Sequence, residues 1–236
     1  MLEGAKVLSE ALDAHARIEA VYVAAGATGE AVARRAFDAG IRVFELAPGV
    51  MEQVADTVTP QPVLAVAAYI DVPLDDVVAT ARSLVVCADV RDPGNAGTVL
   101  RSAEASGVGG VVSCDGSVDL YNPKTVRASA GAVFHVPVVA GGDPLHVLER
   151  IGEAGFRRLG TVARDGTPYT DVDLTGRVAI VLGNEAHGLA DDVGAELDEL
   201  ISIPMEGRSE SLNVGMAAAV LCFEAARQRR ERVGAR

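Results

Sequence analysis

One stretch of sequence carries the most information about the fold: Ile201-Ser-Ile-Pro204-Met205-Glu-Gly207-Arg-Ser-Glu-Ser211-Leu-Asn213-Val-Gly215-Met216-Ala217. It begins as a short apolar strand that ends at Pro204, and a polar loop follows. An apolar pattern typical of a helix starts near Leu212. Ser211 therefore stands where a helix N-cap is expected, with Asn213 in the first turn.

Two further polar loops that contain glycine directly follow predicted strands. They are Pro93-Gly-Asn95-Ala-Gly-Thr-Val-Leu-Arg101 and Ile180-Val-Leu182-Gly183-Asn-Glu185-Ala-His187-Gly188-Leu189. Glycines let a backbone approach a ligand closely, and open α/β sheets bind ligands at the carboxyl ends of their strands. Three such loops in one part of the chain predict a ligand site at that edge.

Each of these loops also has a purely structural interpretation. A helix starting near Asn95 would bury one stripe of side chains and leave Arg101 on another face. The stripe comprises Ala96, Val99, Leu100 and Ala103. Asn95 could instead merely cap this helix while Arg101 pairs with Glu104, and the loop taken alone favours that structural role. His187 is likewise more typical of a surface loop than of an acid–base catalyst.

The chain divides into two predicted α/β units joined by a linker. In residues 1–70 we expect helices at 5–14, 30–39 and 49–56, and strands at 18–24, 41–46 and 62–68. Residues 71–82 contain a proline and three aspartates, and we assign them to the linker.

Residues 83–236 contain short apolar strands that alternate with helical segments. The strands are expected at 84–88, 110–113, 135–139, 159–163, 178–182 and 200–203. Such alternation predicts a mostly parallel sheet covered by helices on both faces. Pro123 suits the first turn of a helix that Asn122 caps.

The composition is that of an ordinary globular protein. Of the 236 residues, 49% are hydrophobic and 23% charged, which predicts packed domains rather than disorder. The longest apolar runs are strand-length, so we expect no membrane span, and with no signal peptide visible we expect a cytoplasmic protein. Cys87, Cys114 and Cys222 are far apart in apolar segments, which predicts buried side chains and no metal site.

The net charge of −12 argues against a nucleic-acid partner. Positive charge is nevertheless concentrated at two places. These are the C-terminal arginines 227, 229, 230, 232 and 236 and the pair Arg157 and Arg158. A local basic patch could bind RNA on an acidic protein, but the C-terminal run fits a solvated helix end at least as well.

Taken together, the three loops resemble a known family. N-x-G-x-x-x-R, V-L-G-x-E-x-x-G-L and I-P-M-x-G-x-x-x-S-L-N-V, in this order, are similar to the three signature motifs of the SpoU (TrmH-like) RNA 2'-O-ribose methyltransferases of the SPOUT superfamily. Residues 127–137 resemble the family's stretch between its first two motifs. The N-terminal part resembles, more loosely, a ribosomal-protein-like domain that binds substrate.

The resemblance implies a fold and a cofactor. It implies a C-terminal SPOUT domain whose last segment forms a deep trefoil knot, which is an exception to the usual absence of knots. S-adenosylmethionine would lie bent in this knot and leave as S-adenosylhomocysteine, with Glu185 ordering the pocket. The backbone groups implied to hold the cofactor belong to Leu182, Gly183, Ile203, Met205 and Leu212.

The implied reaction is attack of an RNA ribose 2'-hydroxyl on the methyl group of the cofactor. We expect Arg101 to stabilise the developing negative charge, aided by Asn95, Ser211 and Asn213. A guanidinium stays protonated in proteins, so an electrostatic role is easier for Arg101 than that of a base. Ribosomal RNA is favoured over transfer RNA by analogy only, and a non-catalytic RNA-binding factor with the same fold is the alternative.

The resemblance also implies a homodimer with the last helix in the interface. Gly215 stands where many members have a small hydroxyl residue, which weakens the expectation for that contact alone. The chain begins almost at Glu3 and Gly4 of the substrate domain, without the basic leader of many relatives, and this could weaken RNA binding.

Overall fold

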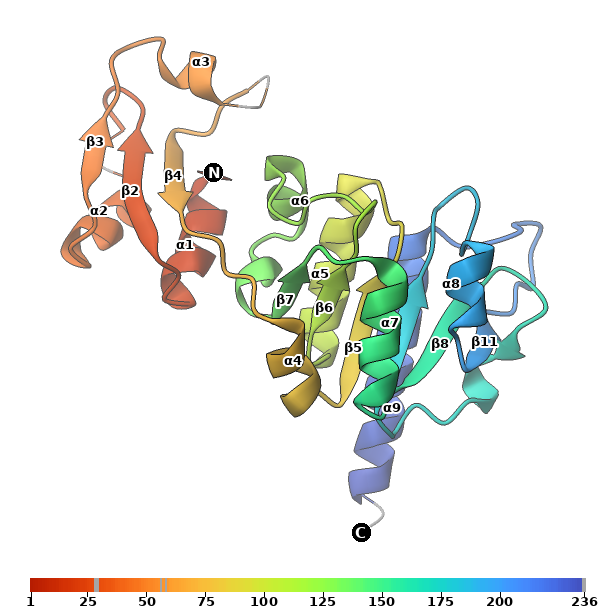
Figure 1. The fold of residues 1–236 in the computed structure, drawn as a ribbon. Coiled ribbons are helices and arrows are strands. Elements are labelled where there is room, and N and C mark those ends of the chain that lie inside the picture. Colours follow the sequence, from red (N-terminus) through yellow and green to blue (C-terminus); the bar gives the residue numbers. More distant parts are fainter. Residues whose placement is uncertain (28–29, 56, 58, 235–236) are drawn as a thin grey trace.

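The chain folds into two α/β units, each built on its own sheet, in the computed structural model (Figure 1). The structure describes residues 1–27, 30–55, 57 and 59–234. No helix of these residues is long and apolar enough to cross a membrane.

The N-terminal unit has a four-stranded sheet in the order β1-β4-β2-β3. Its elements are β1 (Leu2–Glu3), α1 (Ala5–Asp13), β2 (Ile18–Val23), α2 (Ala31–Asp38), β3 (Val43–Glu45), α3 (Met51–Val54) and β4 (Val63–Ala67). The predicted helices and strands are present, although β3 and α3 are shorter than expected. Residue 56, the predicted end of the third helix, lies outside the described residues. The two-residue strand β1 was not predicted because it is too short to show a period.

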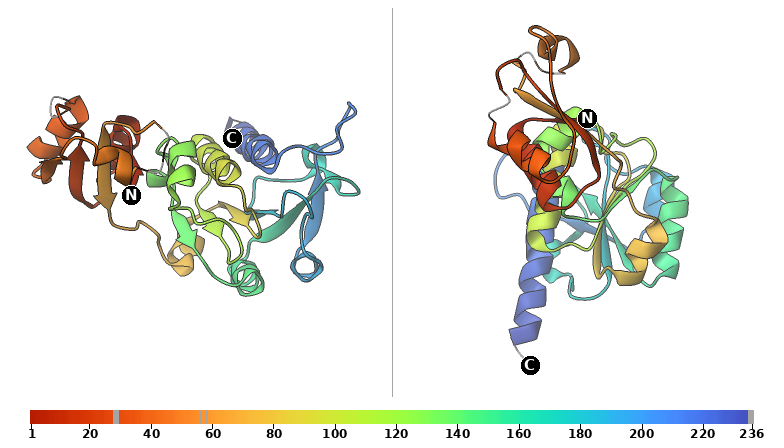
Figure 2. Two further views of the ribbon diagram at one scale, coloured as in Figure 1. Left: turned by 90° about the horizontal axis from the view of Figure 1, so that it is seen from above. Right: turned by 90° about the vertical axis from the view of Figure 1, so that its left-hand side faces the viewer.

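The C-terminal unit has a seven-stranded sheet in the order β7-β6-β5-β10-β8-β11-β9, and all its strand pairs are parallel. Its strands are β5 (Ser83–Cys87), β6 (Val111–Ser113), β7 (Val138–Ala140), β8 (Arg157–Val162), β9 (Thr167–Pro168), β10 (Val178–Leu182) and β11 (Glu199–Ser202). Its helices are α4 (Leu74–Thr80), α5 (Pro93–Ser106), α6 (Pro123–Ala128), α7 (Pro144–Glu153), α8 (Asp191–Ala195) and α9 (Val214–Gly234), with 3-10 turns η1 (Ala132–Phe134) and η2 (Tyr169–Asp171). Helices α5 and α9 cover one face of the sheet, and α4, α7 and α8 cover the other (Figure 2). The prediction of a doubly covered parallel sheet is confirmed.

The predicted linker, residues 71–82, contains a helix that was not expected from the sequence, α4. Val77 and Val78 of α4 are buried in the core of the C-terminal unit. Asp75 and Asp76 lie in the first turn of α4, where acidic side chains stabilise a helix, and in the sequence they were read as turn formers. The chain before α4 is held by Tyr121, whose hydroxyl accepts a hydrogen bond from the Ile70 N–H at 3.2 Å.

Helix α5 presents the predicted apolar stripe to the core, and α9 packs along it. Helix α5 starts earlier than predicted, because Asp92 is its N-cap and accepts a hydrogen bond from the Asn95 N–H at 2.8 Å. Asn122 caps α6 as predicted, through the Lys124 N–H at 2.9 Å. The predicted strand at 135–139 begins only at Val138, because residues 135 and 136 form a turn and bend that follow the 3-10 turn η1.

The three cysteines are buried in this unit, as predicted. Burial raises the pKa of each of the Cys87, Cys114 and Cys222 thiols to about 12. They are therefore protonated and unreactive at neutral pH. Among the described residues no group of three or more His, Cys, Asp or Glu side chains could hold a metal ion.

The two units share a continuous apolar core, and ion pairs between charged side chains join them. Arg127 of α6 donates to the Glu3 carboxylate at 2.8 Å, and the side chain of Glu3 is only 1% exposed. His135, just after η1, lies 2.9 Å from the Glu10 carboxylate of α1. These contacts hold β1 beside α6 and α1 beside η1.

Candidate active site

The structure joins the three predicted loops through one chain of hydrogen bonds. Glu185, after β10, accepts a hydrogen bond from the side-chain amide of Asn95 at 2.9 Å. The Asn95 side-chain oxygen in turn accepts from the amide of Asn213 at 2.7 Å, between residues 118 positions apart. One residue from each motif thus meets at the carboxyl edge of the sheet.

Asn213 is also the N-cap of α9, a role that we had predicted for Ser211. Its side-chain oxygen accepts from the Gly215 N–H at 2.9 Å and the Met216 N–H at 3.3 Å. The prediction was wrong because the helix begins at Val214, two residues later than its apolar pattern indicated. Ser211 is exposed, and its side chain makes no hydrogen bond with the described residues. Asn95 and Asn213 are therefore held by structural contacts, and Ser211 is not brought into their cluster.

Glu185 is the charged acceptor at one end of this series of hydrogen bonds. Burial raises the pKa of its carboxyl, but hydrogen bonds from the Asn95 amide and from backbone N–H groups, including those of Asp92 and Arg91, outweigh burial and hold the pKa below its ordinary value of 4.5. The carboxylate is therefore ionised at neutral pH. It accepts from the Asp92 N–H at 3.2 Å, so it also contacts the first turn of α5.

We expect Glu185→Gln to lower stability at neutral pH but not in acid. Because the pKa is lowered in the folded protein, the contribution of Glu185 is complete above about pH 4.5 and is lost as the pH falls through the folded-state pKa. Thermal unfolding of both proteins between neutral and acidic pH measures this, with the exposed Glu206→Gln as control. A difference from the wild type that stays constant in acid would contradict the assignment.

Two glycines of the motifs are required by close backbone packing. A Cβ at Gly97 would lie 2.4 Å from the Ala128 Cβ, so Gly97 lets α5 approach α6. A Cβ at Gly183 would lie 2.5 Å from the backbone of Gly188, across the tight loop that presents Glu185. Gly215 packs in the same way on Thr98, since a Cβ there would lie 2.9 Å from the Thr98 Cβ. The chain thus has a steric reason for glycine where many relatives were expected to have a hydroxyl residue.

The residues predicted to contact a cofactor lie in the loops next to this cluster. Leu182 is the buried last residue of β10, and Gly183 follows it. Ile203 directly follows β11, and Met205 and Leu212 lie half-buried in the loop before α9. Within the described part of the chain, the backbone groups of residues 204–212 make no hydrogen bond with other backbone groups. This loop therefore offers donors and acceptors to a ligand.

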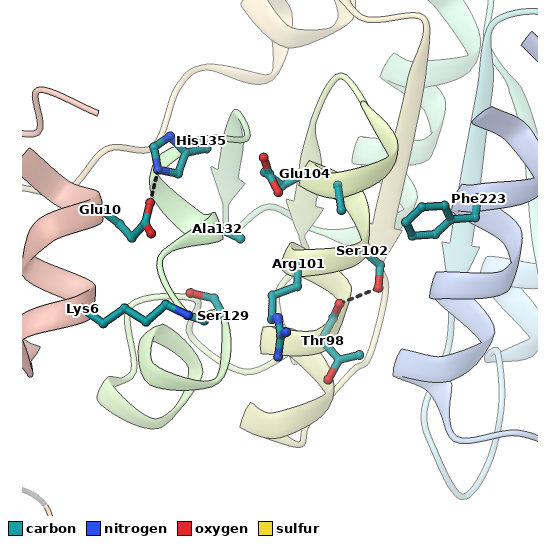
Figure 3. Close-up of a pocket in the computed structure, with 12 residues that line it drawn as sticks. Lys6, Glu10, Thr98, Arg101, Ser102, Glu104, Ser129, Ala132, His135 and Phe223 are labelled. Carbon is teal, nitrogen blue, oxygen red and sulfur yellow. Dashed lines mark hydrogen bonds and ion pairs between the residues drawn. The ribbon is translucent and has the colours of Figure 1, made fainter. Parts of the chain in front are cut away.

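Arg101 lies on the opposite face of α5 from the core and is exposed, as predicted. It lines a cavity of about 590 Å³ together with Lys6, Ser129 and His135 (Figure 3). No ion pair joins Arg101 to Glu104 or to any other carboxylate of the described residues, so the structural alternative for Arg101 is not observed. Sequence reasoning missed Lys6, which comes from the N-terminal unit and has no motif around it.

Solved structures that resemble this fold include methyltransferases. The SpoU methyltransferase AviRb from Streptomyces viridochromogenes has a TM-score of 0.85 and 27% identity, covering 97% of this chain and 89% of its own. An AdoMet-bound rRNA methyltransferase from Sinorhizobium meliloti has a TM-score of 0.82 and 30% identity, and the match covers 95% of this chain and 85% of that protein. The fold and the joined loops define the class as a SPOUT-type methyltransferase.

Sequence comparison shows the family. The model of the SpoU rRNA Methylase family matches residues 82–223, and that of the MRM3-like substrate binding domain matches residues 1–65. The 23S rRNA (guanosine(2553)-2'-O)-methyltransferase RlmP of Bacillus subtilis is 34% identical over 223 residues, covering 94% of this chain and 86% of the relative. The 23S rRNA (guanosine-2'-O-)-methyltransferase RlmB of Xanthomonas axonopodis pv. citri is 41% identical over 152 residues, which cover 64% of this chain and 61% of the relative. The chain belongs to the SpoU rRNA Methylase family.

Proposed function

We propose that the protein transfers a methyl group from S-adenosylmethionine to a ribose 2'-hydroxyl of ribosomal RNA. The observation that carries the proposal is the hydrogen-bond chain Glu185–Asn95–Asn213, which assembles all three motifs at one edge of the sheet. The family match and the names of the relatives, two of which act on 23S rRNA, support the substrate class. This chain of contacts also favours the enzyme over a non-catalytic RNA-binding factor.

The loops fit S-adenosylmethionine, which supplies an electrophilic methyl group when bound. Leu182, Gly183, Ile203, Met205 and Leu212 would hold it through their backbones, which fits a loop whose backbone groups lack backbone partners. The close packing of Gly183 on Gly188 keeps side chains out of that part of the pocket. A deep trefoil knot in the C-terminal unit, which the family implies, would bring the loop after β11 beside that after β10.

The chain's own residues would act by positioning and by charge. Glu185 and Asn213 fix the Asn95 amide from both sides, so the first turn of α5 is held rigidly. That rigidity orients Arg101, less than two turns along the same helix. Arg101 stays protonated and would stabilise the oxyanion that develops as the 2'-hydroxyl attacks. Alignment of the two reactants supplies much of the remaining acceleration.

Ribosomal RNA is the proposed substrate and transfer RNA is the second candidate. Among the solved structures, a tRNA-modifying TrmH/SpoU enzyme of A. aeolicus covers only 68% of this chain. RlmP of Bacillus subtilis covers 94%, including the N-terminal unit. A protein that modifies ribosomal RNA in a bacterium works in the cytoplasm, and this is the location that we propose.

We also propose a homodimer with α9 in the interface. Met216 and Phe223 are large apolar side chains with exposed fractions of 59% and 46%. They are seven residues apart and so lie on one face of the helix, where a second copy would cover them.

The dimer predicts that Phe223→Glu yields a monomer. A charge placed in a buried apolar contact is costly to desolvate, whereas the half-exposed position tolerates it in a single subunit. Size-exclusion chromatography with light scattering measures the mass, and circular dichroism confirms the fold. Val233→Glu, at the exposed end of α9, is the control. A wild-type protein that runs as a monomer would refute the dimer.

The proposed reaction is tested first by calorimetry with S-adenosylmethionine. Tritiated cofactor is then incubated with ribosomal RNA and, separately, with transfer RNA, and digestion to nucleosides identifies the labelled position. Labelled 2'-O-methyl nucleosides from ribosomal RNA are the expected result. Cofactor binding without transfer to either RNA would favour the non-catalytic factor.

A further inference from the structure

Several of the arginines that the sequence offers for RNA are already engaged within the protein. Arg227 pairs with Glu224 at 2.7 Å and with Glu231 at 2.6 Å. Arg229 is partly buried, and it donates to the Ser83 hydroxyl at 3.1 Å and to the Ser106 carbonyl at 3.2 Å. Arg232 donates to the Thr175 hydroxyl, Arg230 is exposed, and Arg236 lies outside the described residues. The C-terminal run considered from the sequence is therefore engaged in part.

The second predicted patch is engaged as well. Arg158 pairs with Asp198 at 2.9 Å, and its backbone N–H donates to the same carboxylate. Arg157 donates to the Asp173 carbonyl at 2.8 Å. An acidic protein that binds RNA does so through local cations, so unpaired cations beside Arg101 are candidates for contact with a phosphate.

The cavity beside α5 contains two cations on opposing walls. In Figure 3, Lys6 extends from α1 toward the α5 side, and Arg101 projects from α5 into the same space. Neither forms an ion pair with a carboxylate of the described residues. Of the two acidic side chains that line the cavity, Glu10 is paired with His135 at 2.9 Å and Glu104 is exposed.

The position of Lys6 is set by the contacts between the two units. Glu10 lies one turn after Lys6 on α1, and its side chain packs on Gly131, where a Cβ would come within 2.3 Å. Glu3, just before α1, is held by Arg127. Lys6 therefore faces the cavity because the N-terminal unit is docked at both of these points.

We propose that Lys6 binds a backbone phosphate of the substrate RNA strand where that strand presents the target ribose to Arg101. The inference rests on the proposed function and adds a positioning residue from the N-terminal unit of the same chain. A lysine suits this role because its ammonium group is a compact point charge, and a contact with a phosphate does not depend on the base sequence.

The test compares RNA binding by the full-length wild type, Lys6→Gln, Lys6→Arg and the matched control Arg34→Gln. Arg34 is an exposed cation of the same unit that lines a different cavity. Fluorescence anisotropy with a labelled single-stranded RNA oligonucleotide is measured over a series of salt concentrations. Loss of one phosphate contact on a single strand reduces the slope of log K against log salt by about 0.7.

The expected result is a reduced slope and a several-fold weaker affinity for Lys6→Gln, with both retained in Lys6→Arg and Arg34→Gln. In methyl transfer, Lys6→Gln should raise the KM for RNA with little change in kcat. A Lys6→Gln slope equal to that of the wild type, or an equal loss in Arg34→Gln, would overturn the proposal. Calorimetry with S-adenosylmethionine and methyl transfer by the wild type separate the two ideas. A wild type that binds no cofactor or transfers no methyl group would refute the proposed function, whereas the RNA slopes would still test the role of Lys6.

Discussion

Arg101→Ala is expected to lower the rate of methyl transfer by about 10²–10³-fold, as removal of one oxyanion-stabilising group does in other enzymes. Arg101 is exposed and contacts no carboxylate of the described residues, so its loss should leave the fold intact. Arg101 is not among the residues proposed to hold the cofactor, which lie in the loops after β10 and β11, and binding of S-adenosylmethionine should therefore be unchanged. Single-turnover transfer from tritiated cofactor, with calorimetry beside it, measures both quantities.

Two further variants sharpen this prediction. Arg101→Lys keeps the charge without the planar fork and should retain part of the rate. Glu104→Gln, one turn along the same face of α5, should retain the full rate and controls for a change at that surface. A parallel loss of cofactor affinity in Arg101→Ala would mean that Arg101 supports the pocket and does not act on the reacting oxygen.

Arg127→Met is expected to destabilise the protein by about 3 kcal/mol, because it leaves the buried Glu3 carboxylate without its cation. The remaining partners of Glu3 are the Thr57 hydroxyl and the Gln61 N–H, and neither carries a charge. Since Glu3 begins the N-terminal unit and Arg127 belongs to the C-terminal one, the loss should loosen the contact between the units. Urea unfolding of the full chain measures the free energy.

A double variant distinguishes this cause from simple loss of packing. Glu3→Gln removes the buried charge, so Glu3→Gln/Arg127→Met should be more stable than Arg127→Met alone. The exposed Lys124→Met, one turn earlier on α6, should change stability little. If the double variant is no more stable than the single one, the ion pair is not the source of the effect.

Much of the fold could be predicted because it follows from patterns of residues that are close together in the sequence. The period of apolar residues in α5 predicted its buried stripe, and the continuous apolar run of β10 predicted a strand. The order of the three motifs, through its resemblance to a family, indicated the class of enzyme and the edge of the sheet where its site lies. Each of these inferences needs only neighbours within a few turns or one strand.

The incorrect predictions have one physical cause. Where the local sequence allowed more than one conformation, contacts between residues distant in sequence determined which one formed. Ser211 and Asn213 are both good caps, and the choice fell to Asn213 because its amide also reaches Asn95 across the sheet edge. Helix α4 forms in the predicted linker because Val77 and Val78 find a core to enter.

The sequence by itself determined most of the strands and helices, the family and the residues of the three motifs. Only the tertiary structure decided what those residues contact: the Asn95 amide lies between Glu185 and Asn213, and Lys6 faces the same cavity as Arg101. Docking of the N-terminal unit through Glu3 and Arg127 brings Lys6 there. The reason is that side-chain contacts between distant segments depend on the path of the whole chain, which no local pattern records.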